Sequence, residues 1–345
     1  MATHYIGADV DSRMTNLAVE CNGRIVQELC VPTTIPSLVL ALEQIRRPRK
    51  LTFEEGPMAH WLARNLGLHV EELIVCDPRR NGLVKHDGDK DDRIDARKLA
   101  SLLRGGFLRG VYHSDDDQHV LLKQWVGLYS DRVKDAVRHI NKIRALCWRF
   151  GQRPPRGALR NATCRQEWLT SLDDHPLASQ AAMLFVGYDA VAQQVIQSRR
   201  KMVALAKTYP IIEFWQELPG VGPVRAITLF AYLDTPWRFG GNPHKLCKYC
   251  GVGLERSSSG KDRNGRMKIG QLQLAWQVNR RLKAAVMGAA LSAIRQGSNG
   301  FASQHERLVH NGLTSGNALH TVARKMLTVM WGMWKTGTRF DSRRM

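Results

Sequence analysis

The chain has 345 residues and a formal net charge of +20, from 51 Lys and Arg against 31 Asp and Glu. A chain of this length exceeds one ordinary domain and can bury a sizeable core. Its seven cysteines show no disulfide-scaffold spacing, which argues against a disulfide-stapled secreted protein. Because no apolar run is long enough for a bilayer and the start lacks signal-peptide features, we expect a cytoplasmic protein without a membrane partner.

The positive charge is unevenly distributed. Residues 1–112 hold 16 Lys and Arg against 15 Asp and Glu, whereas the remaining residues hold 35 against 16. A strongly basic body with a sequence pI near 10.1 favours binding to phosphate backbones through counterion release. The alternative is a basic protein of the membrane surface, but the sequence has neither a lipidation signal nor a long amphipathic basic helix.

The first 112 residues predict three strands followed by alternating helices and strands. Asn22-Gly23 is a strong hairpin signal between the second and third strands. This order is typical of a ribonuclease H-like (RuvC-like) mixed-sheet domain. The predicted strands cover 4–10, 15–21, 24–31, 51–54 and 72–76, and the predicted helices cover 35–45, 58–66 and 93–103.

Four acidic residues lie at the ends of these predicted strands or at the start of the last predicted helix. Asp9 ends the first strand, Glu54 ends the fourth, and Asp92 and Asp95 share one face at the start of the last helix. In a ribonuclease H-like order these positions converge, and carboxylate oxygens suit Mg²⁺ or Mn²⁺. A two-metal site can hold the attacking and leaving oxygens of a phosphodiester. The alternative is that they are solvated first-turn and turn residues.

Two long helices are predicted over 118–150 and 177–207, joined by a Pro-, Gly- and Arg-rich segment over 151–161. They indicate an antiparallel arm or a coiled-coil contact between subunits. An intramolecular helical subdomain fits the pattern equally well. We therefore expect three domains, over 1–112, 113–210 and 211–345, the last of them mainly α-helical.

A glycine-rich turn precedes the helical run 225–233 in the third region. The turn Pro219-Gly220-Val221-Gly222 aims backbone N–H groups at an anion, as hairpin-type elements do when they hold DNA phosphates. We therefore expect Gly220 and Gly222 to bind nucleic acid. A purely structural glycine turn is the alternative.

Ser257, Ser258 and Ser259 follow in a segment rich in Gly, Ser and basic residues, which we call the serine loop. We expect its basic residues to bind nucleic acid. A hydroxyl next to fixed positive charge suits a nucleophile that forms a phosphoserine. The alternative is a flexible phosphate-binding loop. Residues 271–294 predict a core helix with a basic face near nucleic acid. The basic residues of the loop are Arg256, Lys261, Arg263 and Arg266, and those of the helix are Arg280, Arg281 and Lys283.

The joint order of these motifs resembles the DEDD transposases and recombinases of insertion sequences guided by a structured bridge RNA, together with related site-specific DNA invertases. The resemblance covers nearly the whole chain. It is carried by Tyr5-Ile6-Gly7-Ala8-Asp9, Phe53-Glu54-Glu55-Gly56, Lys90 to Arg97, Pro219 to Gly222, Ser259-Gly260 with Gly265-Arg266, and Trp331 to Asp341.

One departure from the family pattern and the run of three serines leave alternatives within the site. The family has Glu-x-Thr-Gly where this chain has Glu54-Glu55-Gly56, so Glu55 is an alternative ligand. Ser259 is the preferred nucleophile because it directly precedes Gly260, as in the family motif, and Ser258 is the runner-up.

The resemblance implies an RNA-guided recombinase or transposase in which Asp9, Glu54, Asp92 and Asp95 hold Mg²⁺ or Mn²⁺ and Ser259 attacks DNA. The implied partners are donor and target DNA, a structured non-coding guide RNA, and further copies of the chain as a dimer, or a tetramer on paired DNA. The implied location is the bacterial cytoplasm, associated with the nucleoid. Two rival readings are a metal-dependent Holliday-junction-type nuclease or resolvase without a covalent intermediate, and a non-catalytic nucleic-acid-binding protein.

Overall fold

The computed structural model describes residues 2–79, 91–173, 175–256, 272–275 and 278–342. The chain divides into two compact units, Met1–His113 and Ser114–Met345. Each unit has a hydrophobic core of its own. None of the helices within the described ranges combines the length and the apolarity that crossing a membrane requires.

The first unit contains the predicted strands and helices, with small shifts at their ends. They are β1 (His4–Val10), β2 (Met14–Cys21), β3 (Arg24–Pro32), α1 (Ile35–Glu43), β4 (Arg49–Glu54), α2 (Ala59–Leu66), the 3₁₀ turn η1 (Gly67–His69), β5 (Glu72–Cys76) and α3 (Asp92–Arg104).

The five strands form one sheet in the order β3-β2-β1-β4-β5. β1 pairs with β2 antiparallel and with β4 parallel. Asn22 and Gly23 both have positive φ, at 52° and 80°, which is the conformation of a two-residue hairpin turn and confirms the predicted β2–β3 hairpin. This mixed sheet is compatible with a ribonuclease H-like fold.

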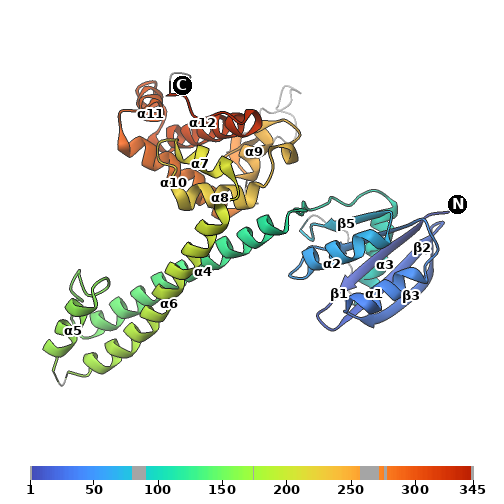
Figure 1. Cartoon of the computed structure of the whole chain (residues 1–345), viewed down its shortest axis with the longest axis horizontal. Coiled ribbons are helices and arrows are strands. Elements are labelled where there is room, and N and C mark those ends of the chain that lie inside the picture. The colour runs from blue at the N-terminus through green and yellow to red at the C-terminus, as the bar shows by residue number, and fades with distance from the viewer. Residues whose placement is uncertain (1, 80–90, 174, 257–271, 276–277, 343–345) are drawn as a thin grey trace, which may run out of the picture. The chain divides into compact units, whose positions relative to one another are not determined.

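The two faces of the sheet are covered differently. Helices α1 and α2 pack on one face over an apolar core, and α3 packs on the other (Figure 1). Because strand side chains alternate between faces, each strand sends one set of residues into this core and the other set towards α3. The largest fully buried side chains of this core are Ile6, Leu42, Leu51, Phe53 and Leu62.

The second unit is mainly helical, as predicted for the part beyond residue 112. Its elements are α4 (Asp117–Arg149), α5 (Ala162–Ser171), α6 (Leu177–Ala206), α7 (Pro210–Gln216), α8 (Pro223–Leu233), the 3₁₀ turn η2 (Pro236–Phe239), α9 (Pro243–Tyr249), β6 (Leu254–Arg256), β7 (Leu272–Leu274), α10 (Arg280–Gln296), α11 (Gly300–His310) and α12 (Ser315–Thr336).

Helices α4 and α6 pair antiparallel and form the predicted arm (Figure 1). Near α5, Cys147 late in α4 shares a small core with Leu177 early in α6. At the other end, Leu122 and Met202 belong to the core of the C-terminal helices. The base of the arm and the C-terminal region are therefore packed as one unit, and the division into three domains stays a prediction.

One prediction about this unit was wrong in part. Residues 271–294 were expected to form one helix, but Leu272–Leu274 is a strand paired antiparallel with Leu254–Arg256, and α10 begins only at Arg280. The side chain of Asn279 accepts hydrogen bonds from the backbone N–H groups of Arg281 and Leu282, and so caps the helix there. A strand that depends on a partner in a distant segment leaves little local signal.

Candidate active site

The sheet places Asp9 and Glu54 on the same face. Ala8 in β1 pairs with Phe53 in the parallel strand β4, and both side chains lie in the core under α1 and α2. Asp9 and Glu54 are the next residues of the two strands, so their side chains are directed to the opposite face, towards α3. The carboxyl ends of two neighbouring parallel strands thus carry one acid each.

A glycine allows α3 to lie directly on this face. A methyl group added at Gly7 would lie 2.1 Å from the carbonyl oxygen of Ala96 and 2.4 Å from the backbone nitrogen of Ala100. The backbone of α3 therefore crosses β1 at Gly7, two residues before Asp9. Since Asp92 and Asp95 lie in the first turn of α3, this close approach carries them to the strand end that holds Asp9.

Two groups of polar contacts fix α3 along the sheet. Buried Glu20 in β2 accepts a hydrogen bond of 2.6 Å from the Ser101 hydroxyl and pairs with the Arg104 guanidinium. Arg97 forms a two-pronged ion pair with Glu28 in β3, at 2.6 and 2.7 Å. Such bidentate contacts set direction as well as distance, so they orient the helix whose first turn carries the paired acids.

The start of α3 is also fixed by its cap. The side chain of Asp91 accepts a hydrogen bond of 3.1 Å from the backbone N–H of Arg93. Within the helix, the ammonium of Lys98 lies 3.9 Å from an Asp95 oxygen. The sequence alone did not indicate a role for Gly7, Asp91 or Lys98, although an Asp directly before a predicted helix, as at Asp91, is a recognisable N-cap signal.

The four acids influence one another electrostatically. The pKa of Asp9 is raised to about 6, first by burial and then by the negative charges of Asp92, Asp95 and Glu54, in that order. Carboxylates that repel one another across a half-buried site disfavour their own ionisation unless a cation joins them. The fold thus brings together the four residues that the sequence singled out, which we call the acid site.

The donor set of the acid site fits a divalent cation, because it offers only carboxylate oxygens. Within the described ranges, however, no three acidic, histidine or cysteine side chains converge to metal-ligand spacing. The role of each acid in holding metal therefore stays a prediction.

Glu55, the alternative ligand, lies in a different setting. One of its carboxylate oxygens is 2.8 Å from Nε2 of His113, whose ring stacks on His60 with centroids 5.9 Å apart. Glu55 is also not among the charges that raise the pKa of Asp9, whereas Glu54 is. The geometry favours Glu54 over Glu55 as a member of the acid site.

The serine loop lies largely outside the described residues. This holds for Ser258, Ser259, Lys261, Arg263 and Arg266. The described strands β6 and β7 pair antiparallel on either side of it, so residues 257–271 connect the two strands of a hairpin. Arg256, the last residue of β6, is exposed.

The glycine turn before α8 packs against α10. Gly220 has φ of 79°, and a methyl group there would lie 2.2 Å from the carbonyl oxygen of Ala289. Arg225 donates to the Gly220 carbonyl at 2.8 Å and to the Ser292 hydroxyl at 2.9 Å. Gly220 thus allows this turn to pack closely against α10, while Gly222 has open space around it at the start of α8. Contact of either glycine with nucleic acid stays a prediction.

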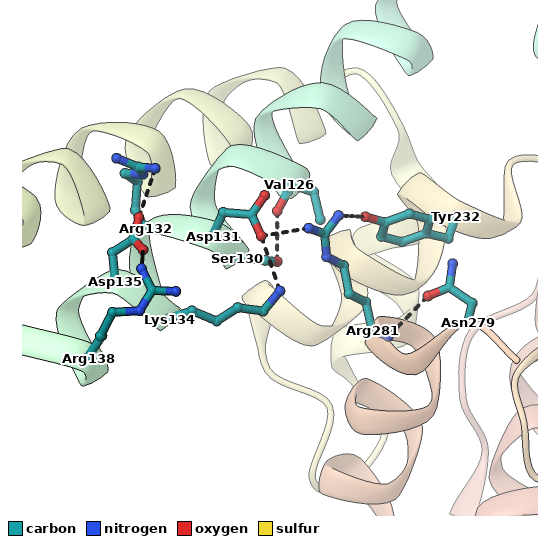
Figure 2. A network of polar contacts seen from close by, with 10 residues as sticks. All are labelled: Val126, Ser130, Asp131, Arg132, Lys134, Asp135, Arg138, Tyr232, Asn279 and Arg281. Carbon is teal, nitrogen blue, oxygen red and sulfur yellow. Dashed lines mark hydrogen bonds and ion pairs between the residues drawn. The ribbon is translucent and has the colours of Figure 1, made fainter. Parts of the chain in front are cut away.

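The two arginines that begin α10 differ in their surroundings. Arg280 is exposed. Arg281 donates to the Tyr232 hydroxyl at 2.7 Å and to a carboxylate oxygen of Asp131 in α4 at 2.8 Å, and Lys134 reaches the same oxygen at 3.1 Å (Figure 2). The side chain of Arg281 is therefore engaged within the protein, where it ties the arm to the C-terminal helices.

Two family models match parts of the chain. A family model described as "Transposase", of the DEDD type named for IS110, matches residues 52–148, which include Glu54, Asp92 and Asp95. A second, described as "Transposase IS116/IS110/IS902 family", matches residues 213–306, which include the serine loop.

A relative supports the same assignment along the chain. The Sinorhizobium fredii protein named "Putative transposase y4qE" is 25% identical over 356 residues, which cover 95% of this chain and 88% of the relative. The first family match spans the later part of the first unit and most of α4, and the second lies in the second unit. Glu54, Asp92 and Asp95 lie within the first match, Asp9 lies before it, and the serine loop lies within the second. The chain therefore belongs to the DEDD transposases of the IS110 type.

Proposed function

We propose that this transposase cuts and rejoins DNA strands by combining the acid site of the first unit with a serine of the second. The observation that carries the proposal is the convergence of Asp92, Asp95 and Glu54 on half-buried Asp9, whose pKa their charges raise. Four carboxylates, two at strand ends and two in the first turn of α3, suit Mg²⁺ or Mn²⁺. When bound there, such an ion would neutralise charge that builds up on the phosphate and lower the cost of forming an alkoxide.

The proposed nucleophile is the hydroxyl of Ser259. Its Oγ attacks the phosphorus, the Oγ–P bond forms, and the bond from phosphorus to the leaving strand's oxygen breaks. The hydroxyl proton is released and the leaving oxygen takes up a proton. The phosphoserine ester conserves the bond energy until the hydroxyl of another strand attacks and Ser259 leaves, so no external energy source is needed. Ser258 is the alternative nucleophile.

We further propose that a structured RNA guides the choice of DNA and that several copies of the chain act together. The net charge of +19 beyond residue 112 supports contact with nucleic-acid backbones. The resemblance to RNA-guided insertion sequences supports the guide, and the antiparallel arm supports contact between copies. If recombination proceeds unchanged after the protein has been freed of RNA by nuclease treatment, the guided mechanism is wrong.

A covalent adduct tests the chemistry. Wild-type protein incubated with Mg²⁺ and a nicked duplex containing the DNA that flanks the gene should give a protein–DNA band on a denaturing gel. Peptide mapping should place the DNA in the segment with Ser257, Ser258 and Ser259. Ser259→Ala should bind DNA and form no adduct, and Ser257→Ala, the matched control, should form it. Cleavage without an adduct would favour a nuclease that uses water.

A further inference from the structure

Three basic side chains of the second unit gather beside the segment that leads into β6. They are Lys283 in α10 and His320 and Arg324 in α12, and we call them the cation cluster. His320 and Arg324 are four residues apart and share one helix face. All three are half-buried. The pKa of His320 is lowered, first by burial and then by the positive charges of Lys283 and Arg324.

The cation cluster is joined to the backbone directly before β6. The Arg324 guanidinium donates to the Val252 carbonyl at 3.1 Å. Gly251 has φ of 75°, and a methyl group there would lie 3.2 Å from Cδ of Lys283. The chain at 251–252 is therefore held between α10 and α12, and β6 begins two residues later. The cluster thus lies at the base of the hairpin β6–β7.

The cation cluster has no anionic partner in the part of the chain that the structure describes. Neither Lys283, His320 nor Arg324 forms an ion pair with a carboxylate there, and the buried Nδ1 of His320 has no hydrogen-bond partner among those residues. By contrast, Arg281, two positions before Lys283, is paired with Asp131. Lys283 and Arg324 are half-buried positive charges, which are costly without a counterion, and His320 adds a ring nitrogen that has no partner among the described residues, so the cluster is suited to an anion from outside the fold.

We propose that Lys283, His320 and Arg324 bind one phosphodiester group of the DNA strand and hold it at the base of the hairpin β6–β7. This inference rests on the proposed function, because it takes DNA as the strand acted on beside that hairpin. A phosphate offers several acceptor oxygens to cations that converge from two helices. The cluster would position DNA, and it adds nothing to the chemical step itself.

The test measures DNA binding without metal, so it does not depend on cleavage. A fluorescein-labelled 30-base-pair duplex is titrated in EDTA with wild type, Lys283→Gln and Lys325→Gln. Lys325 is the matched control, because it is an exposed lysine that directly follows Arg324 in α12. Lys283→Gln should bind about tenfold more weakly at low salt, with a shallower dependence of affinity on salt concentration, and Lys325→Gln should stay within about twofold of wild type.

Stability separates a ligand site from a structural contact. Removing one of several like charges relieves repulsion, so Lys283→Gln should unfold at the same urea concentration as wild type or a higher one while its DNA affinity falls. A double variant with Arg324→Gln should lose less than the product of the two single losses, because both side chains contact the same phosphate.

Three outcomes would overturn the proposal. The first is unchanged DNA affinity in Lys283→Gln, and the second is a loss no larger than that of Lys325→Gln. The third is a loss that is larger for a labelled RNA hairpin than for the duplex, which would assign the phosphate to RNA in place of DNA. If instead the proposed role of the acid site were wrong, DNA binding would still depend on Lys283, and variants of the four acids would cleave DNA as wild type does.

Discussion

The acid site in the first unit and the cation cluster in the second both gather half-buried ionisable groups of one kind, acidic in the first and basic in the second. In the acid site, three carboxylates raise the pKa of Asp9. In the cation cluster, Lys283 and Arg324 lower the pKa of His320. This likeness supports both proposals, a divalent cation at the acid site and a phosphate at the cation cluster, because like groups held close together favour a ligand of opposite charge.

Charges with a partner behave differently in the same elements. In α3, Arg97 and Arg104 pair with carboxylates of the sheet and orient the helix. In α10, Arg281 pairs with Asp131 and ties the arm to the C-terminal helices. A charged residue that is paired within the protein holds its helix in place, whereas one without such a pair can bind a ligand.

Removing an acid from the acid site should give the largest effect. Asp9→Asn or Glu54→Gln should lower strand cleavage about 10³-fold, because the charge that would hold the cation is lost, with DNA binding largely kept. Cleavage of a labelled duplex with Mg²⁺ measures this. Glu55→Gln is the matched control, since Glu55 pairs with His113. An active Glu54→Gln beside an inactive Glu55→Gln would exchange the two assignments.

Moving α3 should break the acid site without touching its acids. Gly7→Ala places a methyl group against the backbone of α3 and should lower the free energy of unfolding by about 3 kcal/mol, with loss of cleavage. Urea unfolding measures the first effect. Gly67→Ala, where nothing lies within 4 Å, is the control and should change little. A Gly7→Ala protein with the stability of wild type would show that α3 does not approach β1 this closely.

The repulsion within the acid site should appear as a pH dependence. Because the folded pKa of Asp9 is raised to about 6 from 3.8, the native state holds this proton more tightly than the unfolded chain. Its stabilising contribution is present below about pH 4 and is lost as the pH rises through 6. Relative to Asp9→Asn, metal-free wild type should lose about 1 to 2 kcal/mol between pH 4 and 7, after allowance for solvent screening.

Urea unfolding of both proteins in EDTA at several pH values tests this dependence. A divalent cation should remove the difference at pH 7, because it binds the ionised carboxylates. Parallel stability curves for wild type and Asp9→Asn would mean that the four acids do not converge in the metal-free protein.

Breaking a paired charge should give the smallest effect and leave DNA binding alone. Asp131→Asn removes the carboxylate partner of Arg281 and should lower the free energy of unfolding by about 1 kcal/mol, since the pair is partly exposed. Lys134→Gln removes a more exposed contact to the same oxygen and should cost less. A loss of DNA affinity in Lys134→Gln as large as in Lys283→Gln would erase the distinction between paired and unpaired charges in this unit.

The sequence by itself determined the local elements of the first unit. Alternation of apolar residues in β1, the Asn22-Gly23 turn and the acid-rich start of α3 are short-range signals, and each predicted element was found near its expected place. The order of those elements predicted that Asp9, Glu54, Asp92 and Asp95 lie near one another, because a strand order of this kind leaves few arrangements of the chain. In the structure the last three raise the pKa of Asp9, and their role as metal ligands stays a prediction.

Only the tertiary structure decided how neighbouring residues divide their roles. Glu54 faces α3 and Glu55 pairs with His113, although the sequence offers both as carboxylates after one strand. Strand β7 was missed because it exists only through its pairing with β6. The different surroundings of Arg281 and Lys283 depend on what another helix brings within reach, and that is fixed by packing between elements far apart in the chain.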